Sequence, residues 1–218
     1  MTTERLLLFD IDGTLLDTGG AGGAALFDAV EELFGVTRDT LAPLNLAGAT
    51  DKGVTRELFA QFQAVLSDDL VSSYLQAYLR HLQRRLHCET FAGRLLPGVV
   101  ELLNALAGAS GVHLGLLTGN VRQGAQLKLA RFGIDHHFKD GAFGDDAEDR
   151  NHLGAVALQR MAAATGRTFD QAAVIVIGDT PKDIACARAI GARCLAVGTG
   201  TFSAAELTRH EPWQCVES

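Results

Sequence analysis

Residues 6–14 of the chain read LLLFDIDGT: an apolar run, then two aspartates one residue apart, then a glycine. A continuous apolar run of this kind is typical of a strand buried on both faces of a parallel sheet. We therefore expect a strand over Leu6–Phe9, with Asp10 and Asp12 directly beyond its carboxyl end. Gly13 would let the backbone turn tightly after them.

Three later segments repeat this pattern of an apolar run that stops at small or polar residues: Val112–Leu117, Val174–Ile177 and Cys194–Val197. Helical patterns lie between the runs, over Val99–Ala107, Arg122–Phe132, Leu153–Ala164 and Ile184–Ile190. Strands that alternate with helices indicate right-handed crossovers. The sequence therefore predicts an α/β fold with a doubly wound parallel sheet, whose ligand sites lie beyond the carboxyl ends of the strands.

The interval from about Asp17 to Thr90 differs, because it shows helical periodicity without a buried strand. Three segments carry that periodicity: Ala24–Phe34, Lys52–Phe62 and Asp68–Leu86. We expect a core at residues 1–16 and 91–218, and an inserted helical unit at residues 17–90. The glycine-rich residues 18–23 suit a hinge into that unit, although a plain loop of small residues fits them as well.

Composition narrows the classes of function. Of the 218 residues, 47% are hydrophobic and 21% are charged, as in ordinary globular proteins, which argues against a disordered or a membrane protein. The net charge of -7 and the lack of a long Lys/Arg run argue against a nucleic-acid binder. We expect a small phosphorylated metabolite as partner, no nucleic acid, no membrane, and a monomer or homodimer.

Cysteine usage and the N-terminal sequence bear on location. The four cysteines form no CxxC pair and are too sparse for a secreted disulfide scaffold, so reduced thiols fit best. The apolar run near the N-terminus ends in acids and is too short for a signal segment or a membrane span. We expect a cytoplasmic protein.

Polar groups follow three of the predicted strands. Asp10 and Asp12 follow the first. Two acids this close are costly unless something pairs them, which a Mg²⁺ ion with its preference for oxygen ligands would do. Thr118-Gly119-Asn120 follows the second and offers a hydroxyl and backbone N–H groups to a phosphate. Asp179 and Asp183 follow the third and could complete a metal shell. Each feature alone also fits a capped turn or an ordinary helix start.

Taken together, the motifs DIDGTLLD, LLTGN and VIGDTPKDIACARAIGA resemble those of the haloacid dehalogenase superfamily, in their order and spacing and over the whole chain. The similarity is to its phosphoglycolate phosphatase-like members. It implies a Rossmann-like core with a helical cap over residues 17–90, and a magnesium-dependent phosphatase acting on a small phosphomonoester.

The resemblance also implies roles, position by position. Asp10 would be the nucleophile that forms an aspartyl-phosphate, and Asp12 the general acid/base. Thr118, Gly119 and Asn120 would bind the phosphate. Magnesium would be held by the side chains of Asp10 and Asp179, by the backbone carbonyl of Asp12, and by Asp183 directly or through water.

One position departs from the family pattern. Where the family usually has a lysine before the last acidic motif, this chain has Arg150. Arginine can hold phosphate oxygens with a planar fork, but it cannot donate a proton at ordinary pH. Lys182 is the fallback candidate, and Arg150 could instead be a solvated partner of Asp149 or Glu148.

Other activities on the same fold remain to be weighed. Dehalogenases of this superfamily generally lack the second aspartate, so Asp12 argues against them, and it also weighs against phosphonate cleavage through Lys52. A sugar-phosphate mutase keeps both aspartates and is the main alternative. A non-catalytic binding relative is less favoured, since the acidic groups are all present. Lys52 and Arg56 are the candidates for contact with the non-phosphate end of the substrate.

Overall fold

The computed structural model describes residues 4–218 and contains a six-stranded sheet in which every neighbouring pair is parallel. From edge to edge the strands are β5 (Gly141–Ala142), β4 (Val112–Leu117), β1 (Arg5–Phe9), β6 (Val174–Gly178), β7 (Arg193–Val197) and β8 (Gln214–Val216). β1 lies between β4 and β6, so its strand end is in the middle of the sheet. The predicted α/β fold with a doubly wound parallel sheet is confirmed.

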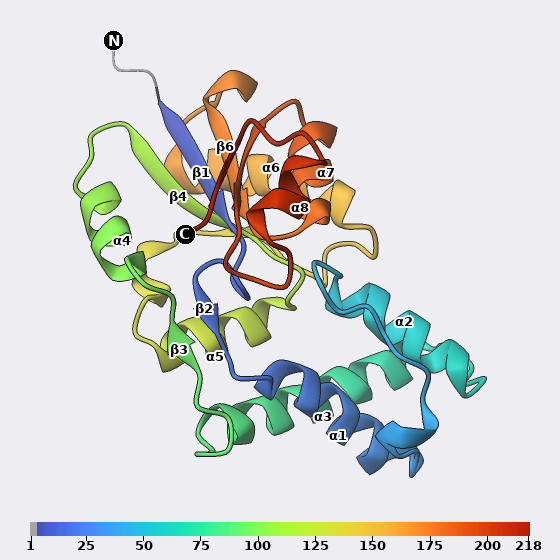
Figure 1. Cartoon of the computed structure of the whole chain (residues 1–218). Helices are drawn as coiled ribbons and strands as arrows, with labels where there is room; N and C mark the ends of the chain where they lie inside the picture. Colours follow the sequence, from blue (N-terminus) through green and yellow to red (C-terminus); the bar gives the residue numbers. More distant parts are fainter. Residues whose placement is uncertain (1–3) are drawn as a thin grey trace.

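Helices cover both faces of this sheet (Figure 1). One face packs against α6 (Leu153–Thr165), α7 (Pro181–Ala189) and α8 (Ala204–Thr208), and the other against α4 (Val99–Ala107) and α5 (Arg122–Arg131). The alternation along β1 shows why: Leu6 and Leu8 point into the first hydrophobic cluster, and Phe9 into the second. A strand buried on both faces needs a continuous apolar run, which is what the sequence has.

The helical insert is a third layer beyond the carboxyl ends of the strands (Figure 1). It consists of α1 (Ala21–Phe34), α2 (Asp51–Gln61) and α3 (Asp68–Leu86), which share a hydrophobic cluster of their own around Phe59, Tyr74 and Tyr78. A short antiparallel ladder of β2 (Leu16–Asp17) and β3 (Arg94–Leu95) joins it to the core. The domain boundaries at residues 17 and 90 stay a prediction.

Several elements differ from the sequence-based expectation at their ends. α1 begins at Ala21, so Gly22 and Gly23 are helical rather than part of a loop, while Gly19 and Gly20 have φ of 63° and 87° and form the turn before it. α7 begins at Pro181 rather than Ile184, because Thr180 and Asp183 form a capping box around that proline. Four short 3₁₀ turns complete the described elements: Arg38–Thr40, Asp135–His137, Arg150–His152 and Gln171–Ala173.

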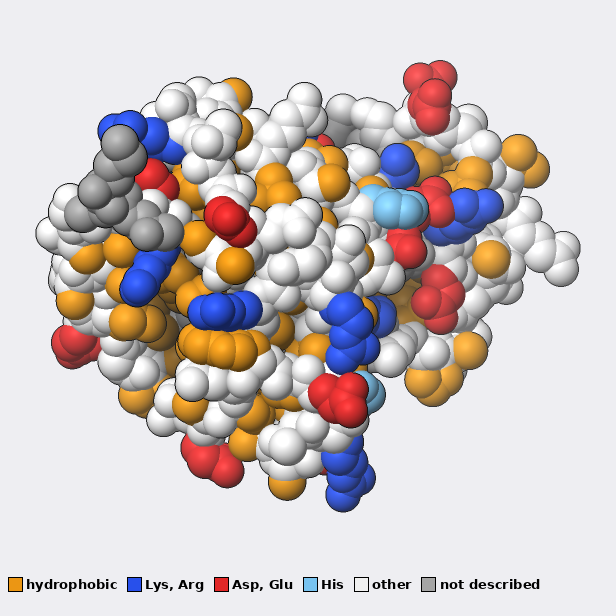
Figure 2. All heavy atoms as spheres, turned by 90° about the horizontal axis from the view of Figure 1, so that it is seen from above, with side chains coloured by type: hydrophobic (Ala, Val, Ile, Leu, Met, Phe, Trp, Pro, Cys, Tyr) orange, Lys and Arg blue, Asp and Glu red, His pale blue; other side chains and the backbone are white. Residues whose placement is uncertain are grey.

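Within residues 4–218, no helix combines the length and the apolar character needed to span a bilayer. On the face seen in Figure 2, basic and acidic side chains alternate among apolar ones, without an extended basic surface. The absence of nucleic-acid and membrane partners stays a prediction.

Candidate active site

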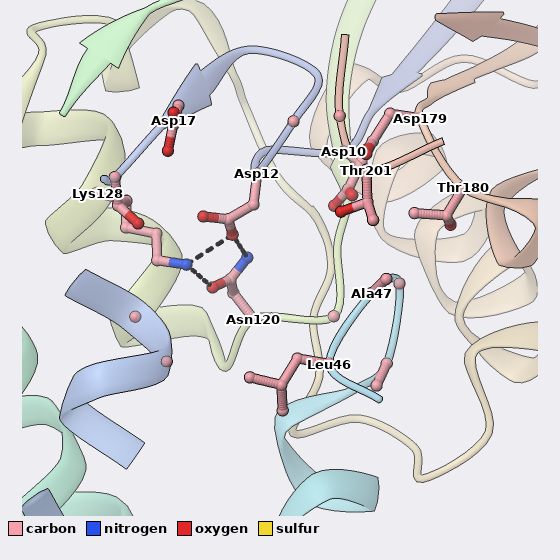
Figure 3. Close-up of a pocket in the computed structure, with 18 of the residues that line it drawn as sticks. Asp10, Asp12, Asp17, Leu46, Ala47, Asn120, Lys128, Asp179, Thr180 and Thr201 are labelled. Carbon is pink, nitrogen blue, oxygen red and sulfur yellow. Dashed lines mark hydrogen bonds and ion pairs between the residues drawn. The ribbon is translucent and has the colours of Figure 1, made fainter. Parts of the chain in front are cut away.

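A cavity of about 510 Å³ lies between the carboxyl ends of the strands and the helical insert, and polar residues that follow the strands line it. Asp10 follows β1, Asn120 lies just after β4, and Asp179 follows β6, and all three line that cavity. The chain after β1 turns as expected, with φ of 78° at Gly13 and a hydrogen bond from Gly13 N to Leu16 O of 2.9 Å. The parallel sheet therefore brings the groups together that are far apart in sequence (Figure 3).

Three carboxylates gather at the core end of this cavity. Asp10, Asp179 and Asp183 are buried, and each offers an oxygen within 4.8 Å of the others. Burial raises the pKa of Asp10 to about 6, with the neighbouring Asp183 and Asp12 adding to the effect and Arg150 opposing it. Burial, together with Asp10 and Asp183, raises the pKa of Asp179 to about 8. The cluster holds more negative charge than the side chains around it neutralise.

The carboxylate oxygens of this cluster are the kind of ligand that a hard divalent cation such as Mg²⁺ prefers. Two glycines of other loops pack directly against the Asp179 carboxylate: a Cβ at Gly200 would lie 1.7 Å from Asp179 Oδ2, and one at Gly13 would lie 2.4 Å from it. Thr14 Oγ1 donates to Asp179 Oδ1 at 3.1 Å. Asp183 is already engaged, because its Oδ2 accepts from the backbone N (3.0 Å) and hydroxyl (2.6 Å) of Thr180.

Arg150 supplies the positive charge at the same end. Its side chain is 4% exposed, and its Nη2 lies 3.2 Å from Asp10 Oδ1 and 2.5 Å from Asp183 Oδ1. Nη2 also donates to Leu117 O (3.1 Å), and Nη1 to Gly48 O in the insert (3.3 Å). Its Nε is buried without a hydrogen-bond partner among the described residues.

The alternatives for Arg150 do not agree with this geometry. Glu148 pairs instead with Arg56, and Asp149 accepts a hydrogen bond from Asn151 N, so neither is a solvated partner of Arg150. Lys182 is exposed and lines a separate cavity of about 380 Å³. Of the two candidate cations, Arg150 is therefore the one that contacts Asp10.

The loop after β4 is built around Asn120. Its Nδ2 donates to Thr118 Oγ1 and to Asp12 Oδ2, both at 2.8 Å. Thr118 is fully buried and does not line the cavity, so it supports Asn120 from behind. It is not the N-cap of α5 either, since that position is Val121. Gly119 is packed so closely against the insert that a Cβ there would lie 1.9 Å from Ala49 O.

Asp12 and Lys128 form an ion pair that the sequence analysis missed. Lys128 Nζ donates to Asp12 Oδ2 and to Asn120 Oδ1, both at 2.6 Å (Figure 3). Lys128 comes from α5 and is buried, like Gly124 one turn earlier. The sequence does place Lys128 on the same face of the predicted helix as the residues that pack against the protein, where a lysine is unusual. The carboxylate of Asp12 is not part of the three-carboxylate cluster.

The insert is attached to the core through Asp51, whereas the basic residues expected to contact the substrate lie outside the main cavity. Asp51 N donates to Gly119 O (2.7 Å) and Asp51 Oδ2 accepts from Val121 N (2.8 Å), so the start of α2 is bound to the loop after β4. Burial raises the pKa of Asp51 to about 6. Lys52 and Arg56 do not line the main cavity, and Arg56 pairs with Glu148 at 2.6 Å on the surface.

Comparison with known proteins assigns the chain to a family. Residues 7–188 match the haloacid dehalogenase-like hydrolase family. The chain belongs to this family. The match covers the strand ends with Asp10, Thr118, Arg150, Asp179 and Asp183, and it agrees with the resemblance stated from the motifs.

Two relatives with similar sequences are named as phosphatases. The chain is 29% identical to a phosphoglycolate phosphatase of Rhodospirillum rubrum, over 90% of this chain and 80% of that one. It is 28% identical to a probable phosphatase, IndB, of Dickeya dadantii, over 99% and 90%. A hydrolase of Pseudomonas syringae has the same fold, with a TM-score of 0.72 at 21% identity over 99% and 94%. The expected enzyme class, a phosphatase of the haloacid dehalogenase type, is confirmed.

Proposed function

We propose that the protein is a magnesium-dependent phosphatase that hydrolyses a small phosphomonoester through an aspartyl-phosphate on Asp10. The observation that carries this proposal is the contact of Arg150 Nη2 with Asp10 Oδ1, within a cluster of carboxylates beside a cavity. A buried carboxylate that faces a cavity and an oriented guanidinium is suited to attack phosphorus, because the cation offsets the charge of the incoming phosphate.

The chain's own groups divide the work. Asp10 attacks phosphorus, while Arg150 orients the phosphoryl oxygens. Asn120 gives both N–H groups of Nδ2 to Asp12 and Thr118, so it acts by holding Asp12 in place. Asp12 gives a proton to the leaving oxygen, and then takes one from the water that hydrolyses the aspartyl-phosphate. Mg²⁺, held by Asp10 and Asp179 with the backbone carbonyl of Asp12 and with Asp183, would neutralise charge on the phosphoryl group.

The insert limits the size of the substrate. Leu46, Ala47 and Gly48 of the loop before α2 line the cavity opposite the catalytic aspartates, and Asp51 binds that loop to the core. A cavity of about 510 Å³ bounded on that side by the insert suits a two-carbon or three-carbon phosphate or a sugar phosphate. The named relatives put phosphoglycolate first, and their being phosphatases means that the mutase alternative is not favoured.

A panel of phosphorylated metabolites tests this function directly. The purified protein is assayed for phosphate release with Mg²⁺, and an Asp10→Asn variant prepared in parallel serves as the control for contaminating phosphatases. Turnover of a small phosphomonoester that depends on Asp10 supports the proposal. Phosphate release that persists in Asp10→Asn, or transfer of phosphate between positions of one sugar without release, contradicts it.

A further inference from the structure

Lys128 is a buried cation that lines the cavity beside Asp12, the proposed acid for the leaving group. Its side chain is 5% exposed, and the ammonium group lies beside Asp12 and Asn120 (Figure 3). A Cβ at Gly22 in α1 would lie 3.2 Å from Nζ, so the glycine leaves room for the ammonium group beneath the insert. A buried lysine is costly unless it is paired, and here it is paired with a proposed catalytic carboxylate.

The two oxygens of Asp12 have different environments. Oδ2 accepts from Lys128 Nζ (2.6 Å) and from Asn120 Nδ2 (2.8 Å), whereas Oδ1 has no hydrogen bond to any residue within 4–218. The Asp12 side chain is 41% exposed and lines the cavity. One oxygen is thus fixed by two donors, and the other is left for the substrate.

Lys128 also fixes which way the Asn120 amide faces. Because the ammonium group has only donors, it requires an acceptor, and Asn120 Oδ1 lies 2.6 Å from it. The amide nitrogen is then directed at Asp12 Oδ2 and Thr118 Oγ1. A flipped amide would set two oxygens against each other at Asp12. The lysine therefore orders a carboxylate and an amide at once.

We propose that Lys128 is a positioning residue for proton transfer to the leaving group: it holds Asp12 Oδ2 and Asn120 Oδ1 so that Asp12 Oδ1 faces the leaving oxygen. This inference rests on the proposed function, because it takes Asp12 as the acid. Lys128 acts through Asp12 and does not contact the phosphoryl group.

The test compares leaving groups. Lys128→Met removes the charge at similar length, and kcat/KM is measured for an alkyl phosphomonoester found in the panel and for p-nitrophenyl phosphate, whose leaving group needs little protonation. We expect about a tenfold or larger loss for the alkyl ester and a loss of less than about threefold for the aryl ester. Asp12→Ala should show the same selectivity, and adding Lys128→Met to Asp12→Ala should change the ratio by less than about twofold.

Lys139→Met, at an exposed lysine outside the cavity, is the matched control and should leave both rates unchanged. If Lys128→Met is poorly folded by circular dichroism, Lys128→Gln gives the same comparison. Equal losses for both esters in a folded variant overturn the proposal, as does a rise in KM confined to substrates that carry a carboxylate. If Asp12→Ala also lacks the selectivity, the proposed role of Asp12 fails; if only Lys128→Met lacks it, this inference alone fails.

Discussion

The two ends of the cavity hold their carboxylates in different ways. At the core end, the buried guanidinium of Arg150 pairs with Asp10 and Asp183, and the pKa values of Asp10 and Asp179 are raised to about 6 and about 8. At the other end, Asp12 pairs with Lys128, and no second ion pair of Asp12 is found within residues 4–218. One end is short of positive charge and the other is balanced. The difference supports the proposal that the added cation binds at the core end and that Asp12 moves the proton.

The largest expected effect comes from the charge-poor end. Asp10→Asn should lower kcat by about 10³-fold or more, because an amide cannot form the aspartyl-phosphate. Asp12→Asn should still allow slow phosphorylation of Asp10 without efficient protonation of the leaving group. The measurements are steady-state turnover and acid-trapped phosphoprotein, with folding checked by circular dichroism. Turnover by pure Asp10→Asn at the wild-type rate would show that the nucleophile is wrong.

Removing the metal tests whether the carboxylates at the core end need an added cation. EDTA should stop turnover, and added Mg²⁺ should restore it, because the carboxylates would otherwise repel the phosphate. The rise in Tm on adding Mg²⁺ should also be larger at pH 8 than at pH 5.5, since protons compete for Asp10 and Asp179, whose pKa values are about 6 and about 8. Full activity after exhaustive chelation, or a pH-independent Tm shift, would contradict the assignment.

Arg150→Ala should have the next largest effect. Loss of the guanidinium should lower kcat/KM by about 100-fold or more, and should destabilise the fold by about 3–5 kcal/mol, because Asp183 is left buried without its partner. Arg150→Lys should recover part of the activity. Lys182→Ala is the matched control and should be close to wild type. Assays at low temperature with Mg²⁺ keep the variant folded, and the reverse ranking of the two alanine variants would move the catalytic cation to the later loop.

The smallest effect concerns the anchor of the insert. The pKa of Asp51 in the folded protein is about 6, against an ordinary value of 3.8, so its contribution to stability is present below about pH 4 and is lost as the pH rises through 6. At about 1.4 kcal/mol per pKa unit this is on the order of 2–3 kcal/mol. Asp51→Asn should therefore gain stability relative to wild type between pH 4.5 and 7.5. Denaturant unfolding at both pH values measures it, and a constant difference would contradict the prediction.

The sequence predicted the core more fully than the site. Long apolar runs identify β1, β4, β6 and β7, but β5 has only two residues, Gly141–Ala142, and is too short for any periodicity to reveal. Asp10 and Asp179 are found because they follow such runs. Lys128 is not, because its place beside Asp12 depends on how α5 packs against the sheet and under α1.

In the insert, the expectation based on charge differs from the structure. Charge favours Lys52 and Arg56 as substrate contacts, yet α2 buries Val54, Leu58 and Phe59 on one side and leaves both basic residues on the other. Helical spacing alone separates these two faces, and charge without spacing was misleading. The residues that do line the cavity from this unit are mostly small or apolar, with Asp17, Asp51 and Tyr78 among them and neither Lys52 nor Arg56.

Arg150 connects the two parts of the molecule in a way that a lysine would not. Its Nη2 lies against Asp10 and Asp183 while its Nη1 donates to Gly48 O in the insert. A lysine has one nitrogen and cannot serve both places at once. If the insert swings away, Arg150 loses one of the contacts that fix its plane, and the nucleophile loses a rigid neighbour. The full set of Arg150 contacts therefore requires the insert to lie against the core as it does here, and an aspartyl-phosphate formed on Asp10, as proposed above, would then have an ordered guanidinium beside it.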